Sequence, residues 1–470
     1  MADYDLAVIG AGAAGLSVTA VAAQLGLRVV LIERARMGGD CLNTGCVPSK
    51  ALLAAAHAAG AARAAGRFGI HAEPRIDWAA VHEHVHAVIA AIAPADSVAR
   101  FTALGAEVIA GEARFVAPDA LAVNGRRLTA RRIVIAAGAR AAAPPIPGLD
   151  GVPYFTNETL FEHRLCPEHL LILGGGPIGL EMAQSFALLG ARVTVVEAAS
   201  IAGREDPALV APLRGILAGQ GVSLIEGVGV AAVEAGPVLV LADGRRIAGS
   251  HLLVAAGRQP NLEALDLAAG QVRATRAGIA TDAGLRSLSN RRVYAAGDIA
   301  DPLGIGARAF THLCSYHAGI VIRRALFRLP ARLDYAALPR VTYTDPELAQ
   351  VGMTEAEARA AGHDPVVLTW KLDENDRAIA ERRTEGLVKL VVTRGGKVLG
   401  AGLLAPHAGE MIGTWTLAIA RKVPLAALAG MIVPYPTLAE IGKRAAGSFY
   451  TARLFAAGTR RLVRWLARLP

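Results

Sequence analysis

Residues 5–33, DLAVIGAGAAGLSVTAVAAQLGLRVVLIE, decide the fold of this chain. A strand over 5–9 is followed by a glycine-rich turn, a helix that reaches residue 25, and a second strand over 28–32 that ends at an acid. The glycines are Gly10, Gly12 and Gly15, and the acid is Glu33. The glycines allow a tight turn and close approach of a pyrophosphate, and the acid can accept hydrogen bonds from a ribose. The stretch therefore predicts a βαβ unit that binds a dinucleotide.

A second copy of this pattern begins near residue 170. Its glycines are Gly174, Gly176 and Gly179, and its acid is Glu197. The first glycine and the acid are 23 residues apart in both copies. Hairpin turns at 124–125 and 243–244 each precede a closing glycine, Gly138 or Gly257, by 13 residues. The chain therefore contains an internal duplication of two dinucleotide-binding halves.

The first copy alone carries the stretch CLNTGCVPSK, residues 41–50, followed by an expected helix over 51–65. A helix N-terminus lowers the pKa of a thiol, so Cys41 and Cys46 suit a redox-active disulfide. Two buried free cysteines or half of a zinc site are the alternatives, but no second Cys/His cluster supplies the missing zinc ligands. Two nucleotide sites and a dithiol together indicate an electron relay.

Bulk composition limits the remaining functions. A length of 470 residues predicts two to four domains. Four cysteines form no disulfide framework and indicate a reducing compartment. The N-terminus lacks the basic segment of a signal peptide, and no apolar run reaches the length of a membrane span. The net charge of +9 is weak evidence about partners, and no aromatic and basic motif supports nucleic-acid binding.

Several isolated residues admit more than one interpretation. His82, His84 and His86 lie two apart, so we expect a helix to place them on different faces, solvated and without a metal. Cys166 and Cys314 are expected to be inert. Asp298 follows a strand over 292–296 and could hold a sugar hydroxyl or simply end the strand. From about residue 339 the pattern changes to a separate α+β domain.

With CLNTGCVPSK and both glycine loops, the chain resembles the FAD-dependent pyridine nucleotide–disulfide oxidoreductases, which include dihydrolipoyl dehydrogenase, glutathione reductase and mercuric reductase. The resemblance runs from residue 3 to about 449. It implies an α/β fold with two Rossmann-like domains, for FAD and NAD(P), and a C-terminal α+β dimerisation domain. The expected divisions are an FAD domain with the disulfide insert (1–148), an NAD(P) domain (149–275), a central segment completing the FAD domain (276–338), a dimerisation domain (339–449) and a basic amphipathic tail (450–470).

The same resemblance implies roles for individual residues. Cys46 would touch the flavin and Cys41 would exchange with substrate, while Lys50 and Glu181 would form an ion pair near the flavin. The FAD site would consist of Gly10, Gly12, Gly15, Glu33, Gly39, Lys50, Ala113, Gly138 and Asp298. The nicotinamide site would consist of Gly174, Gly176, Gly179, Glu197 and Gly257. The family also implies a homodimer in which one subunit completes the active site of the other.

Two features bear on cofactor and acceptor. Glu197 suits the free 2′-hydroxyl of NAD, although Arg204 could meet a 2′-phosphate, so we favour NAD(H) over NADP(H). Tyr435 stands where dihydrolipoyl dehydrogenase and glutathione reductase have a histidine base. Glu440 matches the glutamate that follows this base in the family. A tyrosine is a poor base at neutral pH, which weighs against efficient dihydrolipoamide oxidation. His312 or His317 could replace the base, or both could be core residues.

Mercuric reductase has a tyrosine at that point, but it also carries a C-terminal cysteine pair, and this chain has no cysteine beyond Cys314. The expected enzyme passes electrons between nicotinamide, FAD and the Cys41–Cys46 disulfide to a disulfide or thiol-bound acceptor, or runs in reverse. Dihydrolipoamide dehydrogenase and mercuric reductase activities remain alternatives.

The tail is the last feature of the sequence. Leu462, Leu466 and Leu469 keep helical spacing among arginines, and no acid follows Glu440. This pattern is typical of an interfacial membrane helix or of a helix packed on the dimer. A flavoprotein electron-transfer module docked by its tail to a membrane or partner is therefore the rival function. The expected location is cytoplasmic, with membrane contact at the inner face as an option.

Overall fold

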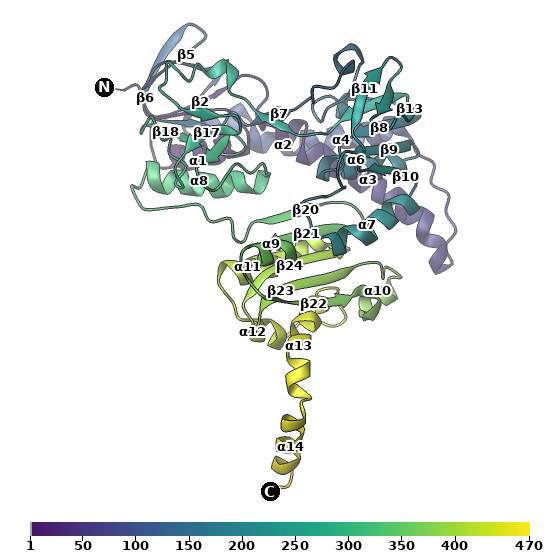
Figure 1. Ribbon diagram of the computed structural model, residues 1–470. Helices are drawn as coiled ribbons and strands as arrows, with labels where there is room; N and C mark the ends of the chain where they lie inside the picture. Colours follow the sequence, from purple (N-terminus) through teal and green to yellow (C-terminus); the bar gives the residue numbers. More distant parts are fainter. Residues whose placement is uncertain (1) are drawn as a thin grey trace.

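The computed structural model describes residues 2–470 (Figure 1). Its first unit is built on a sheet in the order β3-β2-β1-β6, with β18 beside β6 and all of these pairs parallel. The strands are β1 (Tyr4–Ile9), β2 (Val29–Glu33), β3 (Ala106–Ala110), β6 (Arg126–Ile135) and β18 (Val293–Ala295). The antiparallel strands β5 (Ala120–Val123) and β4 (Arg114–Ala117) continue from β6. Residues 111–113 separate β3 from β4.

The second unit repeats this plan with a parallel sheet in the order β10-β9-β8-β14. Its elements are β8 (His169–Leu173), α6 (Pro177–Leu188), β9 (Arg192–Glu197), α7 (Pro207–Gly219), β10 (Val222–Glu226) and β14 (His251–Val254). A three-stranded antiparallel sheet joins it, made of β11 (Val230–Glu234), β12 (Val238–Leu241) and β13 (Arg246–Ala248). The short strands β7 (Ala139–Ala141) and β15 (Arg258–Pro260) pair between the two units.

The two glycine loops have the same geometry. Gly10 has a φ of +102° and Gly174 has a φ of +113°, which is the region that side chains disfavour. A Cβ on Gly15 would lie 1.8 Å from the Gly10 carbonyl oxygen, and one on Gly179 would lie 2.0 Å from that of Gly174. These contacts bring α1 (Ala13–Gln24) and α6 close to their sheets. The duplication seen in the sequence is thus a duplication of structure.

The cysteine insert is helical. It contains α2 (Gly39–Asn43), α3 (Cys46–Ala64), α4 (Trp78–Ile92) and α5 (Val98–Ala103). Helix α3 packs on both α4 and α6, so the insert of the first unit lies against the second (Figure 1). The helix expected over 51–65 begins earlier than predicted, at Cys46 itself. The central segment then supplies β16 (Ala274–Thr275), β17 (Gly278–Thr281), β19 (Ala300–Pro302) and α8 (Thr311–Ala325), and α8 packs on α1.

The C-terminal unit is a five-stranded antiparallel sheet in the order β20-β21-β24-β23-β22. Its elements are β20 (Pro339–Thr342), β21 (Glu347–Gly352), α9 (Glu355–Ala360), β22 (Pro365–Lys371), α10 (Asp376–Ala380), β23 (Leu387–Thr393), β24 (Val398–Ala405), α11 (Ala408–Ala420), α12 (Leu425–Gly430) and α13 (Glu440–Leu454). It has its own apolar core around Trp415.

The tail projects from this unit as α13 continues into α14 (Ala457–Leu466), below the body of the molecule (Figure 1). The expected boundary at residue 450 falls inside α13, because the apolar residues Ile441, Ala445 and Ala446 anchor that helix from its start. Within residues 2–470, no helix is both long and apolar enough to cross a membrane.

Candidate redox site

The two cysteines of the insert lie at the start of helices. Cys41 is in α2 and Cys46 is the first residue of α3, and both are free, partly buried thiols. The nineteen-residue α3 directs its unpaired backbone N–H groups and the positive end of its dipole toward Cys46. A thiolate is therefore favoured at Cys46.

The two thiols differ in acidity. A hydrogen bond from Cys41, a second from Thr311 and the charge of Lys50 lower the pKa of Cys46 to about 6, against the opposing effect of burial. The Thr311 hydroxyl, at the start of α8, lies 3.0 Å from the Cys46 sulfur. The hydrogen bond to Cys46, together with burial, raises the pKa of Cys41. Near neutral pH the pair therefore consists of a Cys46 thiolate and a protonated Cys41.

An ion pair lies one helical turn beyond Cys46. The Lys50 ammonium donates to a Glu181 carboxylate oxygen at 2.7 Å, which links α3 to α6. The Glu181 side chain is only 5% exposed and also accepts the backbone N–H of Tyr343 at 3.0 Å. The Tyr343 ring lies 4.4 Å from the Lys50 nitrogen. Each charge of the pair is thus compensated, as a partly buried pair requires.

A second charged network holds the turn between the cysteines. Arg258 donates to an Asp40 carboxylate oxygen at 3.0 Å and lies 3.5 Å from Asp298. Asp40 also accepts from the Thr44 hydroxyl at 2.8 Å and from the Asn157 amide at 2.8 Å. Burial raises the pKa of Asp298, and the nearby Arg258 opposes this. The sequence alone does not indicate Asp40, Asn157, Arg258 and Thr311 as residues of this site, because only the fold brings them to the cysteines.

The residues expected to hold FAD gather around the first glycine loop. The Glu33 carboxylate accepts the backbone N–H groups of Ala11 at 2.6 Å and Ala35 at 2.8 Å. A Cβ on Gly39 would lie 2.7 Å from the Gly12 Cα atom, so the insert closes directly over the loop. A cleft lined by Gly10, Glu33, Ala113 and others runs along the ends of β1 and β2. Gly138 has a φ of +64° with open space beside it. This cradle fits the pyrophosphate and adenosine of a dinucleotide.

The second glycine loop is arranged in the same way. The Glu197 carboxylate accepts the backbone N–H groups of Gly175 at 2.8 Å and Ala199 at 3.0 Å. Gly176 caps α6 without a side chain, and Gly257, with a φ of +150°, follows β14. Arg204 is exposed, and its carbonyl oxygen accepts a hydrogen bond from Arg340.

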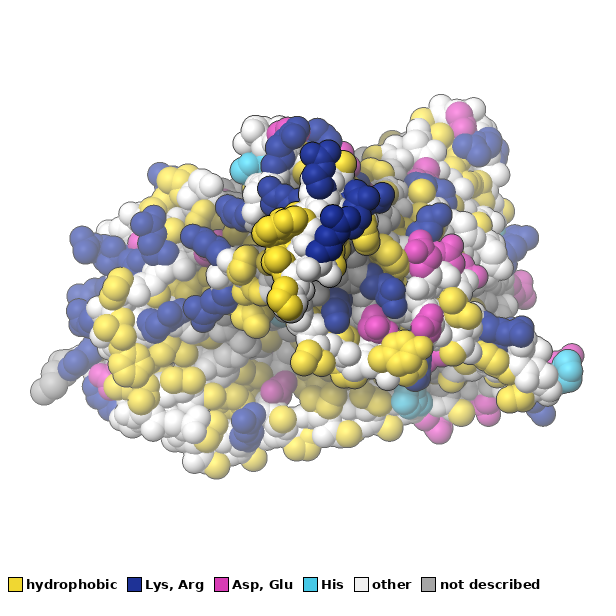
Figure 2. All heavy atoms as spheres, turned by 90° about the horizontal axis from the view of Figure 1, so that it is seen from below, with side chains coloured by type: hydrophobic (Ala, Val, Ile, Leu, Met, Phe, Trp, Pro, Cys, Tyr) yellow, Lys and Arg dark blue, Asp and Glu magenta, His cyan; other side chains and the backbone are white. Residues whose placement is uncertain are grey.

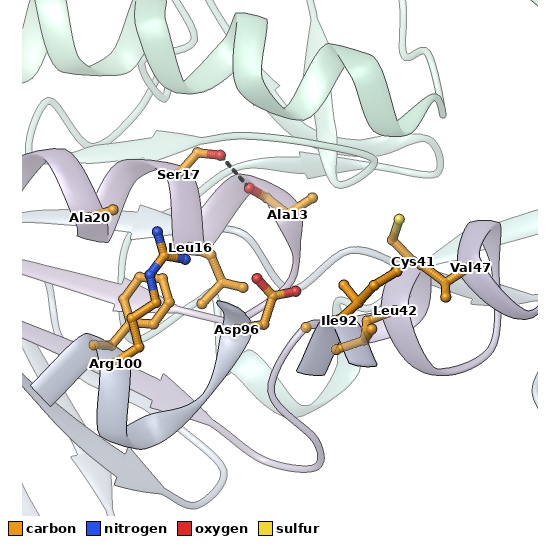
Figure 3. Close-up of a pocket in the computed structure, with 12 residues that line it drawn as sticks. Ala13, Leu16, Ser17, Ala20, Cys41, Leu42, Val47, Ile92, Asp96 and Arg100 are labelled. Carbon is orange, nitrogen blue, oxygen red and sulfur yellow. Dashed lines mark hydrogen bonds between the residues drawn. The ribbon is translucent and has the colours of Figure 1, made fainter. Parts of the chain in front are cut away.

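A cavity of about 380 Å³ opens beside Cys41 (Figure 3). Helix α1 forms one wall and the segment from Ile92 to Phe101 forms another, with Asp96 and Arg100 as its charged residues. Cys41 and Val47 line the cavity. Cys46 contacts Thr311 on α8. Cys41 alone of the two cysteines lines this cavity, and its thiol is hydrogen-bonded to Cys46.

Other candidate residues lie apart from the thiols. Tyr435 is 68% exposed and donates its hydroxyl to Asp376 at 2.8 Å, which raises the pKa of Tyr435. Glu440 begins α13 in the same C-terminal unit, on the side away from α2 (Figure 1). His317 is buried, and burial lowers its pKa to about 4. Its Nδ1 accepts the Gly297 N–H at 3.0 Å, beside Asp298.

The remaining single residues are simple to place. His312 bonds to the Pro339 carbonyl oxygen at 3.0 Å. Burial raises the pKa of both Cys314 and Cys166. The expectation that His82, His84 and His86 lie on different faces is wrong for two of them, because residues four apart share a helix face. The rings of His82 and His86 are 4.2 Å apart.

These features define a dinucleotide-dependent oxidoreductase with a dithiol centre. Residues 4–355 match the family "Pyridine nucleotide-disulphide oxidoreductase", and residues 338–446 match its dimerisation domain. The chain belongs to this family, and the predicted fold class is confirmed. FAD is the family's cofactor, and bound FAD supplies two-electron transfer between a nicotinamide and a disulfide.

Known relatives of the chain are oxidoreductases of the same family. The chain is 39% identical to a mercuric reductase of Streptomyces lividans, covering 95% of this chain and 96% of the relative. It is 33% identical to dihydrolipoyl dehydrogenase 2 of Haloarcula marismortui, with coverages of 94% and 96%. The solved structure of the HOCl-induced flavoprotein disulfide reductase RclA from Escherichia coli, as a Cu(II) complex, matches with a TM-score of 0.84 and 29% identity over 93% of this chain and 98% of that chain. LpdA from Mycobacterium tuberculosis matches with a TM-score of 0.85 and 27% identity, over 96% and 100%.

Proposed function

We propose that this protein is an NADH-dependent flavoprotein reductase that delivers electrons through Cys41 and Cys46 to a disulfide or thiol-bound acceptor. The observation that carries the proposal is the asymmetry of the pair. Cys46 is the more acidic thiol, because the hydrogen bond from Thr311 and the charge of Lys50 stabilise its thiolate. Cys41 lines an open cavity. Residues 1–148 and 276–338 would hold FAD, 149–275 the nicotinamide nucleotide, and 339–449 the dimer contact.

The acceptor step is thiol–disulfide exchange. The Cys41 sulfur, after losing its proton, attacks one sulfur of the acceptor, forms a mixed disulfide and releases the first thiol. The Cys46 thiolate then attacks the Cys41 sulfur, releases the second thiol and leaves the Cys41–Cys46 disulfide. One NADH and one proton restore the dithiol, so each cycle converts one disulfide into two thiols.

A proton donor is needed for the departing thiol. His312 is bonded to Pro339, and His317 is neutral and buried. We assign the role to Tyr435 of the partner subunit, supported by Glu440, because a protonated phenol can donate a hydrogen bond but is a poor base. This arrangement favours reduction of the acceptor over oxidation of a dithiol such as dihydrolipoamide.

An acceptor screen tests the function. Purified holoenzyme is mixed with NADH and lipoamide, glutathione disulfide, other small disulfides or Hg(II), and NADH oxidation is followed. We expect turnover with at least one disulfide and its loss in Cys41→Ser. Turnover that survives in Cys41→Ser would contradict the proposal. Hg(II) is included because mercuric reductases are among the relatives, although the cysteines of this chain end at Cys314.

The preference for NADH rests on Glu197. Its carboxylate sits at the end of β9, where it would meet the adenosine ribose and repel a 2′-phosphate. Glu197→Gln should lower the ratio of the kcat/KM for NADH to the kcat/KM for NADPH. A ratio that rises in Arg204→Ala would instead show that this exposed arginine recognises the 2′-phosphate of NADPH.

The projecting tail supports a second role, docking to the inner, cytoplasmic face of an anionic membrane. Leu462, Val463, Trp465, Leu466 and Leu469 are each about half exposed. Figure 2 shows arginines gathered beside this apolar strip of the tail. A basic amphipathic helix of this kind binds anionic lipid surfaces. Deletion of residues 457–470 should abolish cosedimentation with phosphatidylglycerol vesicles while turnover with soluble disulfides survives. Loss of the dimer instead would assign the tail to the subunit interface.

A further inference from the structure

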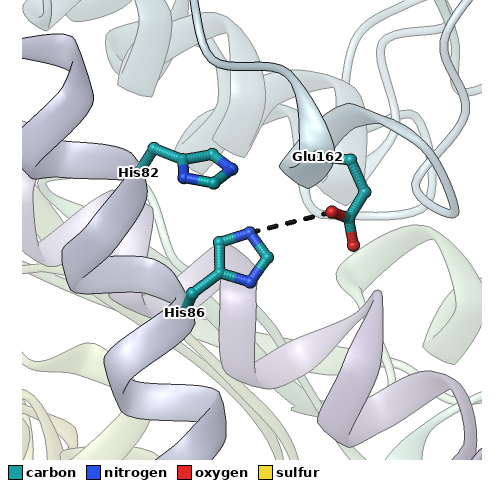
Figure 4. Close-up of side chains that lie close together, drawn as sticks. All are labelled: His82, His86 and Glu162. Carbon is teal, nitrogen blue, oxygen red and sulfur yellow. Dashed lines mark ion pairs between the residues drawn. The ribbon is translucent and has the colours of Figure 1, made fainter.

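A cluster of metal-ligand side chains lies outside the redox site. His82 and His86 lie one turn apart on α4, and Glu162 ends the short helix η4 (Leu160–Glu162) opposite them (Figure 4). One donor atom from each residue lies within 4.8 Å of the other two. The three residues come from two segments about 80 positions apart in the chain, so the fold assembles the cluster.

His82 has a buried ring nitrogen without a hydrogen-bond partner in the described part of the chain, which indicates a missing ligand. Its Nε2 atom is buried and has no hydrogen-bond partner among residues 2–470. Buried polar atoms almost always have a partner, so an orphaned nitrogen indicates that something is missing. The His86 Nε2 lies 4.0 Å from Glu162 and 3.2 Å from the Phe161 carbonyl oxygen. A cation between the three side chains would satisfy His82 and replace the long His86–Glu162 contact.

We propose that His82, His86 and Glu162 bind a divalent transition-metal ion of the Zn²⁺ type. Two imidazole nitrogens and one carboxylate oxygen are a common zinc donor set, with a fourth position left for water. Donor atoms around tetrahedral zinc are about 3.3 Å apart, so the cluster must contract. The Glu162 side chain is 57% exposed and is free to move inward.

The local charges suit moderate affinity. Arg36 lies 4.0 Å from the other Glu162 oxygen and competes for that carboxylate. The ion must displace this weak, exposed ion pair, which costs little.

The site would fasten the insert to the connection between the two nucleotide units. Helix α4 packs on α3, which begins at Cys46. The segment that carries Glu162 also carries Asn157, whose amide donates to Asp40 at 2.8 Å and to the Thr44 carbonyl oxygen at 3.2 Å. A bound ion would therefore stabilise the support of the cysteine turn without touching the thiols.

Calorimetric titration with Zn²⁺ tests the site in the full-length, FAD-loaded protein. A Cys41→Ser/Cys46→Ser background removes the dithiol, which would itself bind zinc. We expect one Zn²⁺ per chain, loss of that binding in His86→Ala, and at least tenfold weaker binding in Glu162→Gln. His84→Ala is the matched control, because His84 is exposed on the same helix and should leave binding unchanged.

A second readout guards against misfolding of the variants. Zn²⁺ should raise the Tm of the background protein and of His84→Ala, but not that of His82→Ala or His86→Ala. Each variant is first compared without metal, where His86→Ala should melt close to the background protein. Equal Zn²⁺ affinity in His86→Ala and His84→Ala, or no binding to the background protein, would overturn the proposal.

Discussion

At the scale of single residues, the acidity of Cys46 is the property on which the chemistry depends. Its pKa of about 6 leaves most of the group as thiolate at pH 7. Because the pKa is lowered, the thiolate is present above about pH 6 and is lost as the pH falls below it. The alkylation rate of Cys46 by iodoacetamide in the reduced holoenzyme should therefore rise through pH 6, well below the range of an ordinary thiol.

Thr311 offers a direct test of the cause. Thr311→Val removes a hydrogen bond that stabilises the thiolate and should raise the midpoint of the alkylation profile by about one pH unit. Thr311→Ser keeps the hydroxyl and is the control. Peptide mapping separates Cys46 from Cys41. A profile that is identical in Thr311→Val and the unaltered protein would show that Thr311 does not act on the thiolate.

The Lys50–Glu181 pair predicts an asymmetry between its two partners. Glu181 is buried, whereas Lys50 is 39% exposed and can reach water when it loses its partner. Lys50→Met should therefore lower the free energy of unfolding by about 1–3 kcal/mol, more than Glu181→Gln does. Urea denaturation of the FAD-loaded protein measures both. The opposite order would mean that the lysine is the more poorly solvated charge.

The sequence indicates some of these residues as candidates and gives no sign of others, for a physical reason. The glycines, Glu33 and Glu197 act within their own βαβ unit, so their spacing is sufficient to reveal them. Thr311 meets Cys46 across 265 positions, and Arg258 meets Asp40 across 218. Such contacts depend on the packing of whole units. The prediction that His82 and His86 lie on different helix faces was wrong for another reason. Their spacing of four residues already places them on one face of a helix.

At the scale of elements, the close contact between the cysteine insert and the first glycine loop is a constraint that can be tested. Gly39 has a φ of +57°, and its Cα lies against that of Gly12. Gly39→Ala should push the cysteine segment off the loop and weaken FAD retention at least tenfold, as measured by flavin release on ultrafiltration. Gly215 lies in α7 with open space around it. Gly215→Ala is therefore the control, and equal FAD retention in the two variants would contradict this account.

At the scale of the whole molecule, the dimerisation domain predicts that the C-terminal unit is covered by a second copy. Ile432 is 99% exposed in the single chain and stands three residues before Tyr435. Ile432→Glu should dissociate the dimer in sedimentation velocity and reduce turnover with disulfides. Leu165→Glu alters a 69% exposed leucine outside this unit and is the control. A dimer that is unchanged in Ile432→Glu would place the interface elsewhere.

The most direct test of the central claim is the absorbance spectrum of two single variants of the FAD-loaded protein at pH 8. A thiolate in contact with the bound flavin produces a long-wavelength band. Because Cys46 is the thiol assigned to the flavin and Cys41 the thiol assigned to the cavity, Cys41→Ser should show this band without any reductant, and it should fade as the pH falls through about 6. Cys46→Ser should lack it. A band present in Cys46→Ser and absent from Cys41→Ser would contradict the account.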